Sequence, residues 1–414
     1  MSKKILVIGG GVVGTACAYY LARRGHTVKI IERKAFGSGC SHANCGYVSP
    51  SHVLPLATPG AISTTLRAML RKNSPFYIKP RFSWALWSWL FKFARRCNEK
   101  AMLESAAGIT ALLNSSREMY DTLFEEEGFD PEWQTRGLVF AFMTSAGMEH
   151  HAEAEKCSRE RFGIGANRLD GEALNQLEPA LLPGLAGGFH YEMDAHLRSD
   201  KLMSDWRNVI TRHGVEVIEN CGFESFVRQN GHATAAQTSQ GEIEADTFVL
   251  ATGAWTPQLK LDLGCKIPIQ PGKGYSMTMA KPNRCPKYPM MFEEHRVAVT
   301  PMQSGYRLGS IMEFAGYNDT LDVRRMKILT ESAKLYLHEP TAEPVMERWT
   351  GWRPMTYDSR PLIGPAPAVP NVYLAAGHNM LGLSMATGTG TLIAEMIEGR
   401  EPHVSPEAYS PARF

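Results

Sequence analysis

The chain has 414 residues, with 44 Lys and Arg against 42 Asp and Glu, and a formal net charge of only +2 at pH 7. A chain of this length can bury a large core and typically forms two domains. The balanced charge, without a long basic block, argues against nucleic acid as a partner, so we expect a small-molecule substrate. The eight cysteines form no CxxC pair, which predicts reduced thiols and no metal site.

The N-terminus enters a strand-like pattern directly, without the basic, apolar and small-residue segments of a secretory signal. No apolar stretch approaches the ~20 residues that span a bilayer. We therefore expect a cytoplasmic protein without a transmembrane anchor.

The first predicted element is a strand over residues 5–8, ILVI, which is apolar at every position, as in strands buried on both faces. It leads into GGGVVG over residues 9–14, a G-x-G-x-x-G pattern. A helix over residues 15–24 and a strand over residues 27–31 complete the start of a βαβ unit. This order of elements predicts a dinucleotide-binding fold.

Each fingerprint residue has a physical task. Gly9 makes the tight turn, Gly11 lets the backbone approach a pyrophosphate, and Gly14 allows close helix packing. The helix N-terminus, at Val12 and Val13, then faces the anion. Glu32 lies 32 − 14 = 18 residues after the last glycine, where a carboxylate accepts hydrogen bonds from ribose hydroxyls and disfavours NADP.

Two later segments favour FAD over NAD. A predicted strand over residues 246–250 runs into a turn of small residues that can approach the cofactor closely. The residues expected to contact the cofactor there are Ala251, Thr252, Gly253 and Trp255. A strand over residues 371–376 leads into a glycine turn over residues 377–382 and a helix over residues 383–397. The helix N-terminus can stabilise negative charge on a reduced flavin. A nucleotide site assembled from both ends of the chain fits FAD better than NAD.

With these motifs the sequence resembles the D-amino-acid oxidase superfamily, and within it the small subunits of bacterial D-amino-acid dehydrogenases. The resemblance covers nearly the whole chain. Besides the N-terminal fingerprint, it is carried by SHANCGYVSP (residues 41–50), KGYS (273–276), WTGWRPMT (349–356) and GHNMLG (377–382).

The resemblance implies an α/β fold in which a Rossmann-like FAD-binding domain is interleaved with a substrate domain built on a mixed or antiparallel sheet. We expect the FAD-binding domain to comprise residues 1–60, 185–270 and 345–414. The substrate domain would comprise residues 61–184 and 271–344.

The resemblance also implies further cofactor contacts. The loop of residues 41–46 should lie over the flavin and pyrophosphate, and Phe223 should contact the adenine. The complete additional set is Arg33, Ser41, His42, Asn44, Gly46, Phe223, Gly377, His378, Leu381, Gly382, Leu383 and Ser384. We expect His378 to contact the flavin through its backbone.

The family's carboxylate-binding arginine maps onto Arg353, because a guanidinium holds a carboxylate with two charge-assisted hydrogen bonds. Tyr275 is a second expected substrate contact, with core packing as an equally good alternative, and Lys273 is a weaker candidate. We predict no catalytic acid–base pair, because orientation is the protein's main contribution to hydride transfer. The segment corresponding to late covalent attachment sites holds no cysteine, and His42 is one position from the histidyl pattern, so we expect non-covalent FAD.

The predicted function is oxidation of a D-amino acid, with cyclic substrates such as D-proline and 4-hydroxy-D-proline included, by hydride transfer to flavin N5. Electrons should pass to a quinone or protein acceptor. Two alternatives stay open: an oxygen-using amine, glycine or sarcosine-type oxidase, and a non-catalytic flavoprotein subunit of a larger complex. The aromatic and basic segment of residues 82–96 fits either a peripheral helix at the inner face of the cytoplasmic membrane or a helix packed in the substrate domain. A homo- or hetero-oligomer is compatible with the sequence.

Overall fold

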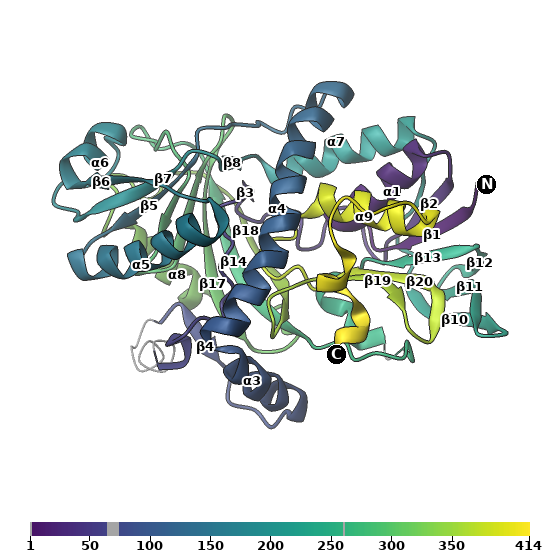
Figure 1. Cartoon of the computed structure of the whole chain (residues 1–414). Helices are drawn as coiled ribbons and strands as arrows, with labels where there is room; N and C mark the ends of the chain where they lie inside the picture. The colour runs from purple at the N-terminus through teal and green to yellow at the C-terminus, as the bar shows by residue number, and fades with distance from the viewer. Residues whose placement is uncertain (1, 64–73, 260) are drawn as a thin grey trace.

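Two main sheets dominate the computed structural model, which describes residues 2–63, 74–259 and 261–414. In Figure 1 the first sheet lies toward the N-terminus label and the second lies on the opposite side, with the long helix α4 (Glu99–Glu127) running between them. Both sheets draw strands from distant parts of the chain.

The first sheet has six strands in the order β19-β20-β13-β1-β2-β9. All neighbours are parallel except β19, which runs antiparallel to β20. The strands are β1 (Lys4–Ile8), β2 (Thr27–Ile31), β9 (Glu216–Ile218), β13 (Thr247–Leu250), β19 (Leu362–Ala366) and β20 (Val369–Ala376).

Strand β1 is buried on both faces, as its apolar sequence predicts. Ile5 and Val7 face one hydrophobic cluster, while Leu6 and Ile8 face another on the opposite side of the sheet. The first sheet is therefore the middle layer of three.

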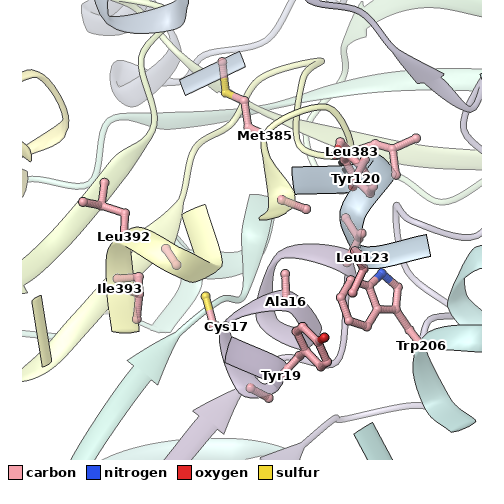
Figure 2. Packing of buried hydrophobic residues seen from close by; sticks show 14 of the residues in the cluster. Ala16, Cys17, Tyr19, Tyr120, Leu123, Trp206, Leu383, Met385, Leu392 and Ile393 are labelled. Atoms are coloured by element: carbon pink, nitrogen blue, oxygen red, sulfur yellow. Dashed lines mark hydrogen bonds between the residues drawn. The ribbon is translucent and has the colours of Figure 1, made fainter. Parts of the chain in front are cut away.

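Helices form the layer on one side. They are α1 (Val12–Arg23), α7 (Ser199–Arg212), α9 (Ala386–Glu398) and part of α4. Figure 2 shows their packing, in which Cys17 of α1 lies among side chains of α9 and Trp206 of α7 lies near Leu123 of α4. The C-terminal helix thus packs on the N-terminal one, which brings both ends of the chain to one sheet.

A small antiparallel sheet covers the other side, with strands β10 (Phe223–Gln229), β11 (His232–Thr238) and β12 (Gly241–Glu244). Phe226 of this sheet meets Phe248 of β13 edge to face, with ring centroids 5.2 Å apart. The contact closes the core on this side of β1.

The second sheet is mixed and has nine strands in the order β18-β14-β17-β16-β15-β5-β7-β6, with β4 also paired to β17. The pair β3 (Tyr47–Val48) and β8 (Ala195–His196) lies outside both large sheets. The nine strands are β4 (Phe76–Ile78), β5 (Leu138–Phe142), β6 (Asn167–Asp170), β7 (Gly187–Tyr191), β14 (Ile269–Met279), β15 (Met290–Phe292), β16 (Val297–Pro301), β17 (Tyr306–Phe314) and β18 (Val345–Thr356).

Four further helices accompany this sheet: α3 (Trp84–Arg96), α5 (Ser145–Phe162), α6 (Gly171–Leu177) and α8 (Val323–Ala333). Short 3-10 helices are η1 (Gly253–Leu259), η2 (Pro406–Tyr409) and η3 (Pro411–Arg413). Among the helices that the structure describes, none has the length and apolar character needed to cross a membrane.

The predicted α/β fold with a Rossmann-like sheet and a second, mixed sheet is confirmed. Helix α1 begins at Val12 rather than at the predicted residue 15, because the last fingerprint glycine already lies in its first turn. Helix α9 begins at Ala386 rather than at 383, because the preceding residues form a turn in which Met385 N donates to Leu381 O.

The division into two domains stays a proposal. Strand pairing refines it: β7 pairs with β5 and β18 pairs with β14, so both belong with the substrate-domain sheet although our ranges place them in the FAD-binding domain. The reason is that hydrogen-bonded neighbours, and not chain order, define a sheet.

Candidate active site

The carboxyl ends of four parallel strands meet at one edge of the first sheet. Strand β1 ends before Gly9, β2 before Glu32, β13 before Ala251 and β20 before Gly377. In open parallel sheets this edge is where ligands bind. Every motif of the dinucleotide prediction therefore converges on one side of the molecule.

The three fingerprint glycines differ in what surrounds them. Gly9 has φ +115°, and a Cβ there would lie 2.5 Å from Ala251 O. A Cβ on Gly14 would collide with Gly9 O. Gly11, in contrast, faces only Ser41 Oγ, at 3.4 Å from an added Cβ. Two glycines thus permit tight packing, and the third leaves open space where a phosphate can approach.

The N-terminus of α1 presents backbone donors toward this space. Gly11 is the N-cap residue, and the first turn carries no acidic side chain. Val12 N donates to Ser41 Oγ at 2.9 Å. Glu32 accepts from Gly10 N at 2.9 Å through Oε2, which fixes its carboxylate beside the glycine turn. A helix N-terminus of this kind favours an anion.

The loop of residues 41–46 is fastened to the second sheet by its own carbonyl oxygens. Ser276 Oγ donates to Ala43 O at 2.7 Å, and Thr300 Oγ1 donates to Cys45 O at 2.7 Å. The guanidinium of Arg307, which is 1% exposed, donates to Asn44 O at 2.7 Å. The loop therefore joins the dinucleotide-binding edge to strands β14, β16 and β17.

One cavity of about 2290 Å³ runs along this edge and under the second sheet. Ordinary ligand sites measure roughly 300–1,000 Å³, so this cavity has room for a cofactor and for further ligands. The predicted site residues that line it are Gly9, Gly11, Val12, Val13, Glu32, Arg33, Ser41, Asn44, Gly46, Phe223, Ala251, Thr252, Gly253, Trp255, Tyr275, Arg353, His378, Leu381, Gly382, Leu383 and Ser384.

Four predicted site residues are not among the lining residues: Gly14, His42, Lys273 and Gly377. Gly14 packs inside the turn, and Gly377 has φ +80° with Leu362 and Thr356 side chains against it. His42 Nε2 pairs with Glu347 Oε1 at 2.8 Å. Lys273 is 1% exposed, and its Nζ donates to Thr320 O at 2.5 Å. Burial lowers the pKa of Lys273.

Arg353 lies on β18 with its guanidinium against the cavity. Its Nη1 donates to Ile311 O at 2.8 Å, and no carboxylate among the described residues forms an ion pair with it. Burial lowers the pKa of Arg353, but an arginine stays charged at neutral pH. An added Cβ on Gly274 would collide with the guanidinium, so this glycine makes room for it. The result is a cation in the cavity wall that lacks a protein counter-ion.

Tyr275 lies on β14 and also lines the cavity. Its hydroxyl donates to Glu313 Oε2 at 2.8 Å. Burial and the neighbouring Glu313 carboxylate raise the pKa of Tyr275 well above its usual range, so the phenol stays protonated. Since its proton is directed to Glu313, the phenol oxygen can accept a hydrogen bond from a ligand.

His378 is 3% exposed, and its Nε2 meets Thr389 Oγ1 at 3.0 Å. Burial lowers the pKa of His378 to about 3, so the ring is neutral at physiological pH. A neutral ring held by Thr389 suits a structural role for the side chain. The predicted backbone contact with flavin remains a proposal.

Sequence reasoning missed several neighbours of the predicted residues. Glu313, the partner of Tyr275, lies on β17, which no sequence motif identified. Arg33 lies over the Trp255 ring, with its Cζ 3.7 Å from the centroid, and Tyr317 stacks on Trp255 with centroids 4.6 Å apart. Alternation along β17 would have been the only available signal for Glu313.

The residues present fit FAD. The open space at Gly11, the N-terminus of α1 and the Glu32 carboxylate suit an ADP moiety. The cavity continues from there to Arg353 and Tyr275, so an extended dinucleotide can reach the second sheet. When bound, FAD supplies the hydride acceptor, and Gly9, Gly11, Glu32 and the loop of residues 41–46 would hold it.

Comparison with known proteins supports the FAD cofactor. The family model described as "FAD dependent oxidoreductase" (DAO) matches residues 4–396. Curated proteins named D-amino acid dehydrogenase from Granulibacter bethesdensis and Methylobacterium nodulans are each 33% identical over 422 residues, covering 99% of both chains. Glycine oxidase from Geobacillus kaustophilus has a TM-score of 0.81 at 20% identity, covering 100% of this chain and 99% of that one.

L-proline dehydrogenase from P. horikoshii has a TM-score of 0.74 at 20% identity, covering 100% of this chain and 98% of that one. These structural similarities support the fold, while the family model and the curated relatives establish membership. The predicted resemblance and the predicted FAD cofactor are confirmed. The chain is an enzyme that belongs to the DAO family of FAD-dependent oxidoreductases.

Proposed function

We propose that this enzyme is a D-amino-acid dehydrogenase that holds the substrate carboxylate with Arg353. The observation that carries the proposal is the half-buried guanidinium in the cavity wall, which has no carboxylate partner among the described residues. A buried charge is costly unless it is paired. A substrate carboxylate would supply the missing partner. The curated relatives named D-amino acid dehydrogenase support the same substrate class.

The chain's own residues would act by orientation. FAD, when bound, would supply the hydride acceptor, and the chain's residues would present the substrate α-carbon to it. Arg353 would grip the carboxylate in a two-pronged geometry, and the Tyr275 oxygen, whose proton is directed to Glu313, would accept a hydrogen bond from the amino group. These two contacts would fix which face of the α-carbon meets the cofactor. Arg353 and Tyr275 are the proposed catalytic residues.

Lys273 is the weakest of the three catalytic candidates. Its ammonium is directed to Thr320 O and does not line the cavity. With its Nζ 5.0 Å from the Tyr275 ring centroid, it can support the position of that ring. We propose that Lys273 positions Tyr275 and does not touch the substrate.

The substrate test is anaerobic bleaching of the flavin by a panel of D- and L-amino acids that includes D-proline and 4-hydroxy-D-proline. We expect D-enantiomers to reduce the flavin faster. Arg353→Ala should keep FAD but lose roughly 3–5 kcal/mol of transition-state stabilisation, which is about two to four decades in kcat/KM. Arg353→Lys should rescue little, because an ammonium cannot form the two-pronged contact.

An amine without a carboxylate is the control substrate. It should reduce the parent slowly and should distinguish far less between the parent and Arg353→Ala. Equal losses for amines and amino acids would mean that Arg353 is structural. Failure of every amino acid to bleach the flavin would contradict the assignment of an amino acid as the substrate.

We also propose that FAD is held without a covalent bond. Acid precipitation should release all flavin into the supernatant. Flavin retained in the washed pellet would contradict this and would direct attention to Cys40, Cys45 and His42 in the loop near the cavity.

The electrons are proposed to pass to a quinone or protein acceptor. With substrate present, turnover with a quinone analogue should greatly exceed turnover with dissolved oxygen. Equal rates would favour the oxygen-using oxidase instead.

A peripheral membrane association is proposed from the outer face of α3. Trp84, Trp87 and Phe91 are 80%, 55% and 65% exposed, and we call them the outer aromatic face. Lys92 and Arg95 lie on the same helix. Exposed aromatic and basic residues on one helix are typical of helices that lie in a membrane interface. The parent should sediment with anionic liposomes, and Trp84→Ala with Phe91→Ala should sediment less. No sedimentation of the parent would contradict the association.

A further inference from the structure

The cavity that holds the proposed substrate site continues as an apolar branch beneath α3. We call it the aromatic branch, and its lining residues are Phe76, Leu86, Trp89, Leu90, Phe93, Met312, Phe314 and Met355. None of these side chains is charged. The proposed mechanism assigns no role to the branch, because Arg353 and Tyr275 already bind the carboxylate and the amino group of the substrate.

One face of α3 forms a wall of the branch. Leu86, Trp89, Leu90 and Phe93 follow helical spacing, so they share one side of the helix. Trp89 is fixed: its Nε1 donates to Met355 O at 3.1 Å, and its ring stacks on Phe93 with centroids 5.3 Å apart and planes 11° apart. The wall is therefore an ordered aromatic surface.

The inner end of the branch meets the proposed substrate site. Met355 lies two residues from Arg353 on β18, and Met312 follows Ile311, whose carbonyl accepts from Arg353. Trp89 also approaches Phe314 of β17, with ring centroids 5.5 Å apart. A ligand in the branch would thus lie next to the site where the amino acid is oxidised.

The outer end of the branch reaches the surface beside the outer aromatic face. Trp87 lines the cavity and is also 55% exposed, so it lies at the mouth. Residues 74–94 contribute two charged residues to the cavity lining, Lys79 and Arg81, and both are basic. An apolar path with a basic, aromatic mouth suits a ligand that arrives from a lipid surface and carries no positive charge.

We infer that the aromatic branch binds the ring of a lipid-soluble quinone, with the quinone entering past Trp87. This inference rests on the proposed function and names where its electron acceptor would bind. The overall reaction balances: the amino acid loses two electrons and two protons as it becomes the imino acid, and the quinone gains two electrons and two protons as it becomes the quinol. A flat aromatic wall suits such a ring, because offset stacking on the partly buried Phe93 adds to the burial of its apolar surface.

An apolar substrate side chain is the other ligand chemistry that the branch could take. The entry past Trp87 favours the quinone over an amino-acid side chain. A zwitterionic amino acid dissolves in water and gains nothing from an entry lined by aromatic residues, whereas a lipid-soluble ring does. The two occupants make opposite predictions, because one affects flavin reduction and the other affects its reoxidation.

The test measures flavin reoxidation alone. The holoenzyme is reduced by light with EDTA, without any amino acid, and mixed anaerobically with ubiquinone-1 or with ferricyanide. Trp87→Ala and Phe93→Ala should lower the second-order rate constant for ubiquinone-1 by about ten-fold, as expected when an aromatic contact is lost, and leave the ferricyanide rate unchanged. Phe82→Ala is the matched control, because Phe82 is 97% exposed beside the same helix and does not line the cavity.

Several outcomes would overturn the inference. They are a parent that ubiquinone-1 does not reoxidise, equal losses for both oxidants, and an unchanged quinone rate in both variants. Bleaching by D-leucine and D-alanine is measured on the same variants, and selective loss with D-leucine would assign the branch to the substrate side chain. If Phe93→Ala does not fold, the exposed position of Trp87 makes Trp87→Ala decisive. Because light replaces the amino acid, failure of the proposed substrate leaves the quinone result interpretable.

Discussion

The two walls of the central cavity are built in different ways. The wall at the edge of the first sheet is made of backbone: glycines at 9, 11 and 14, the N-terminus of α1, and the turn at Ala251. The wall beneath the second sheet is made of side chains, among them Arg353 and the hydrogen-bonded pair of Tyr275 and Glu313.

The difference follows from what each wall has to bind. A pyrophosphate is the same in every dinucleotide, and backbone donors at a helix N-terminus suit it without any particular side chain. A substrate must be distinguished from similar molecules, which requires charged and polar groups at defined positions. We therefore expect the first wall to fail through steric substitutions and the second through changes in charge, side-chain position or pH.

The largest effect should come from the backbone-built wall. Gly14→Ala should destabilise the apoprotein by about 3 kcal/mol, because its Cβ would collide with Gly9 O. This value is at the upper end of the destabilisation typical of substitutions that overpack a core. Gly11→Ala should change apoprotein stability by no more than about 1 kcal/mol, as for an N-cap position, yet weaken FAD binding. Thermal unfolding of the apoproteins and FAD titration would measure both. Equal destabilisation by the two substitutions would break the distinction between packing and cofactor glycines.

A smaller effect is expected when the substrate wall is displaced without removing its charge. Gly274→Ala would push against the Arg353 guanidinium, so KM for the amino acid should rise by about ten-fold, the equivalent of about 1.4 kcal/mol. FAD occupancy should not change, because Gly274 lies on β14 in the second sheet. Steady-state kinetics and the flavin absorbance ratio would check this. A parallel loss of FAD would show that the two walls are not independent.

The third effect is a pH dependence in the side-chain wall, similar in size to the second. Burial lowers the pKa of His151 to about 4, so the folded protein keeps this ring neutral while the unfolded chain protonates it below about 6.5. Its contribution to stability is present above pH 6.5 and is lost as the pH falls toward 4, by about 2 kcal/mol at pH 5.

His151→Phe should remove this dependence, because a phenyl ring fits among Phe140, Phe142 and Phe189, whose centroids lie 4.9 to 5.1 Å from the imidazole. The difference in Tm between pH 8 and pH 5 should be smaller in the variant than in the parent. An identical difference in both proteins would show that other buried groups, such as His196, whose pKa burial also lowers to about 4, dominate the acid response.

The sequence by itself determined the cofactor half of this protein. The strand of residues 5–8, the glycine turn, the helix and the second strand that ends before Glu32 are local patterns, and the structure has them as β1, α1 and β2. Local patterns suffice there because backbone groups bind the ligand and because parallel strands bring their carboxyl ends to one edge. The dinucleotide prediction rested on these motifs, whereas the choice of FAD over NAD rested on the later segments at residues 246–255 and 371–397.

Only the tertiary structure decided the side-chain directions in the other half. Lys273 and Tyr275 belong to one motif, yet Tyr275 lines the cavity while Lys273 is directed to Thr320 O. The pairing of β14 with β17 shifts register between these two residues, and such an irregularity re-aims side chains in a way that period-two alternation cannot predict. Three further contacts join residues that lie far apart in the chain, so local sequence patterns could not predict them. They are the contacts of His42 with Glu347, of Tyr275 with Glu313 on β17, and of Trp89 on α3 with Met355.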